Sequence, residues 1–96
     1  MSEDLSHLDI FFYELGNLPL IVLRCKRGYI ATAYINKEMA EKVGDVAGFV
    51  KGVKNVDEFM KAKLKETTSW GENAGIREGM TVKRAMEILN SDEPQS

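Results

Sequence analysis

Three successive runs of apolar and aromatic residues near the start of the chain constrain its fold most strongly. Ile10 to Leu15 and Leu18 to Lys26 flank Gly16-Asn17, a pair that favours a two-residue hairpin turn. Arg27-Gly28 then separates the third run, Tyr29 to Ile35. The pattern predicts a three-stranded meander.

Both faces of the predicted meander are apolar. With two-residue turns, one face carries Phe11, Tyr13, Leu20, Val22, Ala31, Ala33 and Ile35. The other face carries Ile10, Phe12, Ile21, Leu23, Cys25, Ile30, Thr32 and Tyr34. A meander with one face in water would alternate apolar with polar residues, so a further layer must cover each side of this sheet.

A helix and a fourth strand are predicted after the meander. Asn36 is a favourable helix cap, and Lys37 to Val43 follows with an apolar stripe. Gly44 is expected to end this helix, and Val46 to Val53 is predicted to form the next strand. Gly48, inside that strand, indicates either a bulge or a close neighbour.

The last part of the chain predicts two more helices and a fifth strand. Asn55 with Glu58 fits a helix start in which cap and third residue satisfy each other's backbone donors. Leu64 to Thr68 is expected to be a strand, Ser69 to Ala74 a turn or short helix, and Thr81 the cap of a final helix.

The element order βββαβαβα predicts an α+β fold. We expect a single compact domain over residues 10–90, with a mixed sheet of about five strands and helices mainly on one face. Residues 1–9 are expected to be a flexible acidic leader, and residues 91–96 a disordered tail.

The predicted helices are too few to cover both faces of such a sheet. Three short helices can pack against one face of about five strands, because every apolar stripe needs a partner layer. The sequence therefore predicts a homo-oligomer, with a dimer favoured, that buries an apolar sheet face. Helices divided between the two faces are the alternative.

Composition is that of one ordinary globular domain, with 96 residues, 44% of them hydrophobic and 29% charged. The net charge of -2 hides an uneven distribution, because five acidic residues lie near the two ends: Glu3, Asp4, Asp9, Asp92 and Glu93. Without those five of the 15 acidic residues, 13 basic residues stand against 10 acidic ones. That excess is too small to indicate a nucleic-acid partner.

The sequence contains no apolar stretch that would cross a membrane. Its longest uncharged runs are too short, and one of them, Leu15 to Leu23, includes Gly16, Asn17 and Pro19. The start MSEDLSHLD lacks the order of a secretory signal, and a lone Cys25 cannot form an internal disulfide. These features predict a cytoplasmic protein.

Residues for common catalytic and metal chemistry are scarce. The single histidine, His7, lies in the acidic leader, and Cys25 lies within a predicted strand. Neither clusters with a second ligand, so no metal, cofactor or catalytic residue is predicted. Cys25 is interpreted as an inert small apolar residue rather than a reactive thiol.

The most site-like segment is Thr67 to Asn73, TTSWGEN, which follows a predicted strand. Its candidate ligand-binding residues are Thr68, Ser69, Trp70, Glu72 and Asn73. The alternative is structural, because Ser69 and Glu72 have the spacing of a capping box and Trp70 could pack against a neighbour.

A second candidate is the helix start at Gly79 to Arg84. Free backbone donors at a helix start attract anions, and Lys83 and Arg84 add cations in the first turn after Thr81. The simpler interpretation is a Thr81 cap with two solvated cations.

Alternating lysines offer a third candidate surface. Lys61, Lys63 and Lys65 would point the same way from a strand and could line a basic groove. We favour the alternative that they protect a sheet edge from aggregation.

From Gly28 to Leu89 the sequence resembles the YunC-like family of small domains of unknown function. The resemblance rests on an ordered set of motifs: Gly28-Tyr29-Ile30, VAG at Val46 to Gly48, GVKNVDEFM at Gly52 to Met60, and GIREGMT at Gly75 to Thr81. It implies a compact α/β domain with a mixed sheet, and no substrate, cofactor or catalytic residue. Some members carry a cysteine where this chain has Thr32, so a mechanism that needs that thiol would be absent here.

Two functions follow from these patterns. The first is a non-catalytic, self-associating binding or regulatory module, because the sheet is apolar on both faces and no catalytic set is recognisable. The alternative is an enzyme or a small anionic-ligand-binding protein that uses the loop Thr67 to Asn73, with the Thr81 helix start as the anion site. The direction of the Glu72 side chain, into a cleft or back to the Ser69 amide, would help to distinguish them.

Overall fold

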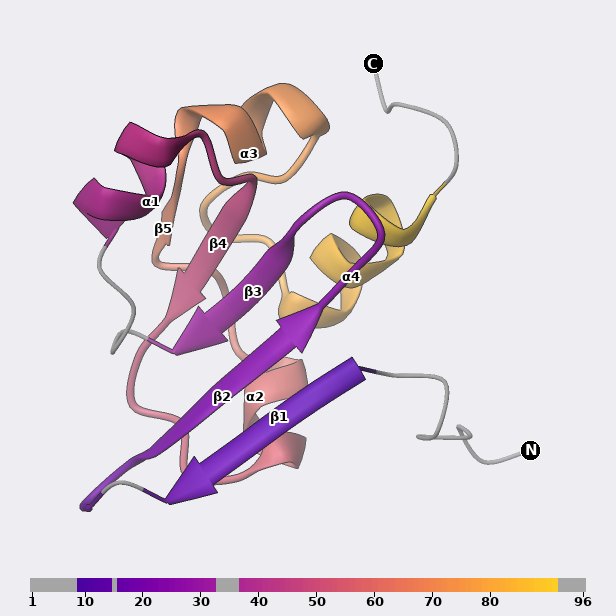
Figure 1. Ribbon diagram of the computed structural model, residues 1–96. Helices are drawn as coiled ribbons and strands as arrows, with labels where there is room; N and C mark the ends of the chain where they lie inside the picture. The colour runs from indigo at the N-terminus through magenta and orange to yellow at the C-terminus, as the bar shows by residue number, and fades with distance from the viewer. Residues whose placement is uncertain (1–8, 15, 33–36, 92–96) are drawn as a thin grey trace.

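A computed structural model describes residues 9–14, 16–32 and 37–91, which form one mixed sheet and the helices that cover it (Figure 1). The strands follow the order of the chain: β1 (Asp9–Glu14), β2 (Pro19–Arg24), β3 (Tyr29–Thr32), β4 (Ala47–Val50) and β5 (Glu66–Thr67). β3 and β4 are parallel, and the other neighbouring strands are antiparallel. The predicted α+β class with a mixed five-stranded sheet is confirmed.

The predicted pairing of β1 with β2 is confirmed. Glu14 pairs with Pro19, as a turn at Gly16-Asn17 requires, and Phe11 pairs with Val22. Side chains therefore alternate as expected. We call the side of Ile21, Leu23 and Ile30 the first face of the sheet, and the side of Phe11, Tyr13, Val22 and Phe49 the second face.

The second turn lies one residue earlier than predicted. The amide of Cys25 donates a 2.7 Å hydrogen bond to the carbonyl of Gly28, so Lys26 and Arg27 form the turn. Gly28 follows the turn just before β3, and only glycine fits there because a Cβ would lie 2.3 Å from the carbonyl oxygen of Val46. The pairing consequently shifts by two residues, which leaves every side chain on its predicted face.

Four helices lie within the described residues: α1 (Lys37–Val43), α2 (Val56–Lys61), α3 (Ser69–Ala74) and α4 (Val82–Asn90). Gly44 follows α1 with a φ of 87°, as expected for a helix end, while Asn36 lies outside the described residues. Asn55 caps α2 by accepting from the amide of Glu58 at 2.8 Å. The carboxylate of Glu58 accepts from the amide of Lys54, not from that of Asn55 as the capping box predicted.

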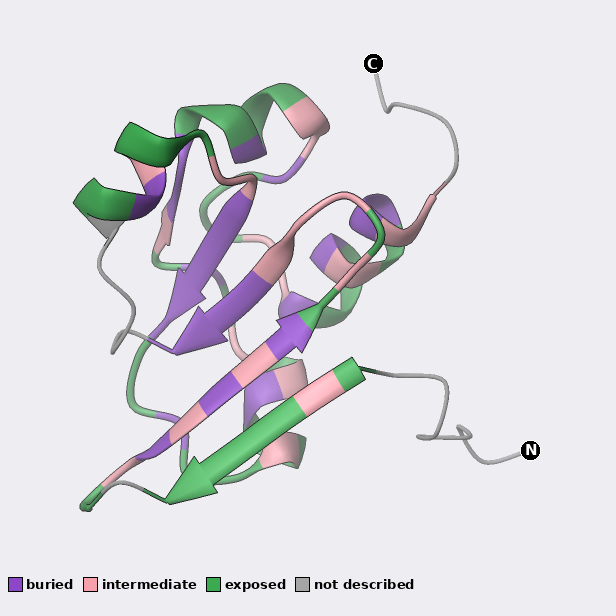
Figure 2. Ribbon diagram, viewed as in Figure 1, coloured by how far each residue is buried: buried purple, intermediate pink, exposed green. Residues whose placement is uncertain are grey.

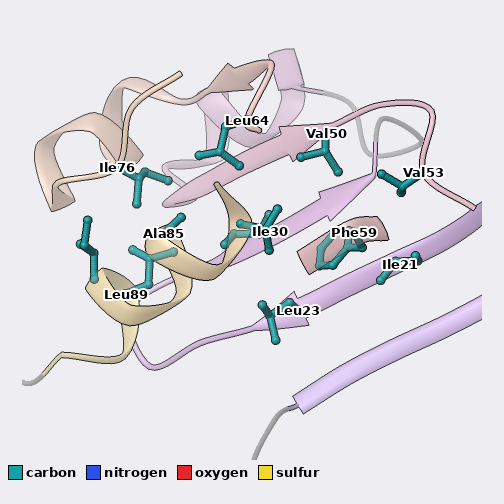
Figure 3. Packing of buried hydrophobic residues seen from close by; sticks show 12 residues of the cluster. Ile21, Leu23, Ile30, Val50, Val53, Phe59, Leu64, Ile76, Ala85 and Leu89 are labelled. Atoms are coloured by element: carbon teal, nitrogen blue, oxygen red, sulfur yellow. The ribbon is translucent and has the colours of Figure 1, made fainter. Parts of the chain in front are cut away.

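The main core lies on the first face of the sheet. α2 and α4 lie behind the sheet in Figure 1 and pack their apolar sides on β2, β3 and β4. Figure 3 shows Phe59 of α2 near Ile21, and Ala85 and Leu89 of α4 on the side of Ile30 and Ile76. All of these side chains are buried, so the first face is closed over β2, β3 and β4, whereas Phe12 of β1, on the same face, keeps 42% of its surface exposed.

The second face of the sheet is closed over only part of its width. α1 places Ala40 on Ala31, Ala47 and Phe49, a small buried cluster over β3 and β4. β1, by contrast, is exposed along almost its whole length (Figure 2), and Phe11 and Tyr13 keep 54% and 57% of their surface in solvent. The helices thus divide between the faces, which was the alternative expectation, yet α1 leaves part of the second face open.

Gly48 of β4 has close side-chain neighbours. A Cβ at this position would lie 3.0 Å from Cδ1 of Leu64 and 3.4 Å from Cδ1 of Ile76. Both residues are buried in the main core. The absence of a side chain at Gly48 therefore lets the segment after α2 and the segment after α3 approach the sheet.

Candidate functional site

Thr68 anchors the polar segment that the sequence singled out. Its buried hydroxyl accepts from the amides of Gly71 at 2.9 Å and Ala47 at 3.2 Å, and donates to the carbonyl of Asp45 at 2.7 Å. One donor and two acceptor positions are all that a threonine hydroxyl offers. Thr68 is therefore the cap of α3, and its hydroxyl has no bonding capacity left for a ligand.

The predicted capping box of Ser69 and Glu72 is wrong by one residue. The amide of Ser69 donates to Oε1 of Glu41 at 2.8 Å, and its hydroxyl bonds to Oε2 of the same carboxylate. The side chain of Glu72 accepts from the hydroxyl of Thr67 at 3.0 Å, so it turns neither to the Ser69 amide nor into a cleft. The earlier residue, Thr68, is the cap because its hydroxyl also bonds to β4.

Glu41 of α1 occupies the place where an external anion would bind at the start of α3. Its carboxylate meets the first amide of that helix, where the helix dipole favours negative charge. Its carbonyl accepts from Nε1 of Trp70 at 3.2 Å, so α1 and α3 are joined twice. Sequence reasoning missed Glu41 because a partner 28 residues away leaves no local signal.

Tyr29 and Asp45 extend this polar cluster to β3. The Tyr29 hydroxyl donates to Oδ2 of Asp45 at 2.8 Å. Burial, and then the hydrogen bond to Asp45 and its charge, raise the pKa of Tyr29 well above its usual range. Tyr29 therefore remains a protonated hydrogen-bond donor and does not act as a general base.

The remaining candidates of α3 lie on its outer side. Trp70 keeps 48% of its surface exposed, and Asn73 is exposed as well. Arg77, just after α3, donates to the carbonyls of Glu72 and Ile76. The cluster around Thr68 thus fastens α3 to α1, β3 and β4.

The second candidate, the start of α4, contains the predicted cap. Oγ1 of Thr81 accepts from the amide of Arg84 at 3.2 Å. The Arg84 guanidinium lies 3.3 Å from Glu87, one turn further along α4, and Lys83 is exposed. Thr81, Lys83 and Arg84 therefore form a capped, solvated first turn, the simpler of the two interpretations.

The lysines of the third candidate do not share one strand. Lys61 ends α2 and pairs with Asp57 at 3.3 Å, whereas Lys63 and Lys65 flank Leu64 between α2 and β5. Lys63 forms an isolated bridge with Thr81. Two exposed lysines thus precede the short edge strand β5, an arrangement that suits edge protection.

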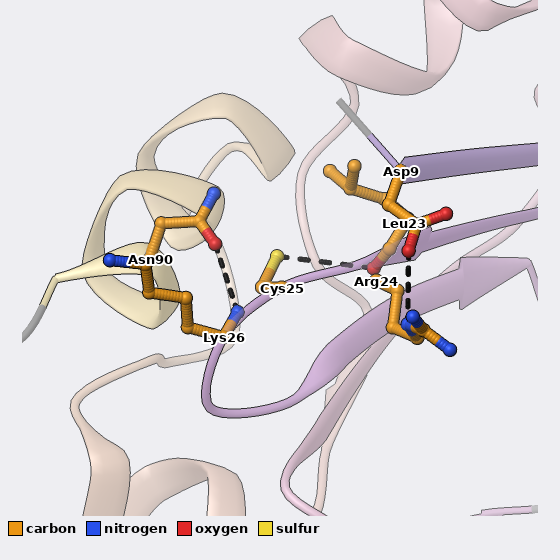
Figure 4. A network of polar contacts seen from close by, with 6 residues as sticks. All are labelled: Asp9, Leu23, Arg24, Cys25, Lys26 and Asn90. Atoms are coloured by element: carbon orange, nitrogen blue, oxygen red, sulfur yellow. Dashed lines mark hydrogen bonds and ion pairs between the residues drawn. The ribbon is translucent and has the colours of Figure 1, made fainter. Parts of the chain in front are cut away.

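Cys25 lies at the end of β2 on the first face, against the main core. Its thiol points to the carbonyl of Leu23 at 3.9 Å, while Lys26 donates to Asn90 of α4 (Figure 4). Burial, and to a lesser degree the charge of Asp9, raise the pKa of Cys25 to about 11. The thiol is therefore protonated and weakly nucleophilic at neutral pH.

Metal-binding and membrane-spanning features are absent from the part of the chain that the structure describes. It contains no cluster of three or more histidine, cysteine, aspartate or glutamate side chains with metal-binding geometry. None of its helices has the length and apolar character needed to span a bilayer. Among the exposed residues that the structure describes are several large apolar ones, and two of them, Phe11 and Tyr13, stack with ring centroids 5.9 Å apart on the second face.

Comparison with known proteins identifies relatives that are themselves uncharacterised. The profile of a family described as "Domain of unknown function (DUF1805)" matches residues 31–89. The uncharacterized protein YunC of Bacillus subtilis (strain 168) is 34% identical over 59 residues, which are 62% of this chain and 57% of YunC. The chain thus spans little more than half the length of that relative.

A solved structure has a similar fold. It is the crystal structure of a protein of unknown function, TA1206, from Thermoplasma acidophilum, with a TM-score of 0.74 and 31% identity. The similarity covers 85% of this chain and 92% of TA1206. None of these names carries a substrate, a partner or a reaction.

Proposed function

We propose that this chain, which belongs to the DUF1805 family of domains of unknown function, is a non-catalytic cytosolic module that self-associates through the second face of its sheet. The partner in this proposal is another copy of the chain, and a dimer is the simplest assembly. In this proposal the module binds another copy of itself, and any regulatory role would act through that association.

The observation that carries the proposal is the open part of the second face. Phe11 and Tyr13 are more than half exposed, although they continue the same face on which Phe49 is buried under α1. Exposed aromatic side chains that lie together on a sheet typically mark an interaction surface. A second copy would remove them from water.

The alternative function, an enzyme or an anion-binding protein, gains no support from the geometry. The hydroxyl of Thr68 is saturated, the start of α3 is occupied by Glu41, and the amide of Arg84 is capped by Thr81. Within the described part of the chain, every buried side-chain nitrogen or oxygen has a partner. Anion binding stays a prediction, which a thermal-shift screen of phosphorylated metabolites would test.

Sedimentation equilibrium over a range of concentrations tests the proposal. Wild type is expected to dimerise, and Phe11→Ser with Tyr13→Ser is expected to remain monomeric and folded, because both side chains are exposed in the single chain. Val43→Ser is the control, since Val43 is an exposed apolar residue of α1 rather than of β1. A monomeric wild type at every concentration would refute the proposal.

A further inference from the structure

We propose that β1 pairs with β1 of a second copy, antiparallel about a two-fold axis, so that the two sheets join into one. The inference rests on the proposed self-association, and it specifies a contact in which the edge of β1, beside Phe11 and Tyr13 of the second face, meets the second copy. A second copy of this chain then occupies the open edge of β1. Backbone hydrogen bonds make the main contact, and aromatic side chains add to it.

The backbone of β1 has hydrogen-bonding groups at alternate positions that no described strand uses. The amide of Ile21 donates to the Thr32 hydroxyl, so the backbone groups of Ile21 point toward β3. In an antiparallel ladder the direction alternates, and the groups of Val22 therefore point toward its partner Phe11 in β1. Among the described strands, none pairs with the outer side of β1, toward which point the backbone groups of Ile10, Phe12 and Glu14.

β1 carries none of the usual devices that prevent edge pairing. Its six residues, DIFFYE, include no lysine, proline or glycine, and its charges lie only at the two ends. The opposite edge strand, β5, has two residues and follows the exposed Lys63 and Lys65. Of these two described edges, the β1 edge is the one long and apolar enough to accept another strand.

Symmetry selects the register of the proposed pair. A two-fold axis perpendicular to the sheet keeps the second faces of both copies on one side, so residues at even positions oppose even ones. Centred on Phe12, the register opposes Ile10 to Glu14 and uses every outward-pointing position of each strand. On the second face it opposes Phe11 to Tyr13 of the other copy, which extends the stack of aromatic rings.

This register also avoids a repulsive contact. Asp9 and Glu14 lie at odd and even positions, and their side chains therefore point to opposite faces of the joined sheet. Asp9 already pairs with Arg24 of β2 at 3.0 Å. The two acidic ends consequently do not oppose one another across the axis.

The size of the contact predicts a weak dimer. At roughly 200 Å² for each aromatic side chain, the exposed parts of Phe11, Phe12 and Tyr13 amount to at most roughly 600 Å² in two copies, because edge pairing covers only the part of each ring that faces the added strand. Stable interfaces bury roughly 1,200 Å² or more, and the remainder must come from the strand backbone and its half-buried neighbours. We therefore expect a dissociation constant in the micromolar range.

Amide hydrogen exchange of the wild-type protein tests the inference directly. The amides of Phe11 and Tyr13 point to β2 and should be protected at every concentration. The amides of Ile10, Phe12 and Glu14 should exchange rapidly when dilute and become protected by about tenfold or more when concentrated. Sedimentation under the same conditions reports whether a dimer is present.

The outcomes separate this inference from the proposed function. A dimer in which the even-numbered amides of β1 stay unprotected would overturn edge pairing, while leaving self-association through the face intact. A monomer at all concentrations would overturn both. Protection of the even-numbered amides that rises together with the dimer fraction is the expected result.

A matched pair of variants provides a second test. Phe12→Pro removes an amide that points away from β2, whereas Phe12→Ala removes a similar side chain and keeps that amide. We expect Phe12→Pro to weaken dimerisation by about tenfold or more relative to Phe12→Ala. Equal dimerisation by two variants that are folded by circular dichroism would contradict pairing through the β1 backbone.

Discussion

The two edges of the sheet use their residues in opposite ways. At the β5 edge, the strand has two residues, and the polar segment after it is bound to α1 and β4 through Thr68 and Glu41. At the β1 edge, a six-residue aromatic strand is exposed on its outer side. The comparison teaches that the polar side chains after β5 bond to neighbouring elements of the same chain, whereas the unpaired backbone groups lie on the apolar strand β1.

The family comparison follows the same division. The matched region, residues 31–89, contains Thr68, Glu41, Asp45 and nearly all of α4 but omits β1 and β2. The similarity to TA1206, by contrast, covers 85% of the chain. The hydrogen bonds of Thr68 and Glu41 thus lie within the region that matches the family, and the β1 edge proposed for dimerisation lies outside it.

The largest expected effect distinguishes two phenylalanines of the second face, one covered by α1 and one on the open strand β1. Phe49 is 1% exposed under α1, and Phe11 is 54% exposed on β1. Phe49→Ala is expected to lower the free energy of unfolding by about 3 to 5 kcal/mol, and Phe11→Ala by less than about 1 kcal/mol. Urea denaturation at a concentration that keeps the protein monomeric would measure both. Similar costs would mean that β1 is covered.

Removal of the Thr68 hydroxyl should have the next largest effect. Thr68→Val keeps the shape of the side chain but leaves the amides of Gly71 and Ala47 without their acceptor. We expect a loss of about 2 to 3 kcal/mol in unfolding free energy. Thr68→Ser retains the hydroxyl and should lose less. Equal losses would assign the cost to packing instead of hydrogen bonding.

Cys25 tests whether the first face is closed at the end of β2. With a pKa near 11 instead of its ordinary value of 9.0, its thiolate fraction at pH 8 is roughly 100-fold lower than in the unfolded chain. Alkylation by iodoacetamide should be slower in the native protein by a similar factor and accelerate as the pH rises toward 11. Because the unfolded thiol ionises first, stability should fall as the pH rises from about 9 to 11. A fast native reaction would show that the first face is accessible at β2.

Neutralising Glu41 should have the smallest effect. Glu41→Gln keeps one acceptor for Ser69 but removes the negative charge from the start of α3. The expected loss is about 0.5 to 1 kcal/mol, and it should shrink at high salt. Glu78→Gln, at an exposed position after α3, is the matched control. No difference between the two variants would remove the role of Glu41 as an anion at the helix start.

The sequence predicted the elements well where the signals were local. Hydrophobic alternation placed the residues of β1 to β3 on their faces, and Gly44, Asn55 and Thr81 marked helix ends correctly. The Lys26-Arg27 turn was misplaced because Gly28 is required by Val46, a contact across strands. Local spacing favoured Ser69 as a cap, whereas Thr68 gained that role through bonds to β4.

The candidate site could be located in the sequence but its purpose could not. The same hydroxyl and carboxylate side chains can bind a ligand or hold two helices together. Their presence in the sequence therefore does not distinguish the two roles. Deciding between these roles required Glu41, which is 28 residues from Ser69 in the chain. The partial cover of the second face was equally hidden, because the placement of α1 over β3 and β4 depends on the parallel crossover.

The position of α4 affects how the chain is made. Val82, Ala85 and Leu89 complete the core on the first face, yet β3 ends at Thr32 and α4 ends only at Asn90. At synthesis rates of about 5 to 20 residues per second, the meander leaves the ribosome seconds before its cover exists. During that interval a nascent chain of this protein therefore lacks the residues that cover the first face of its sheet.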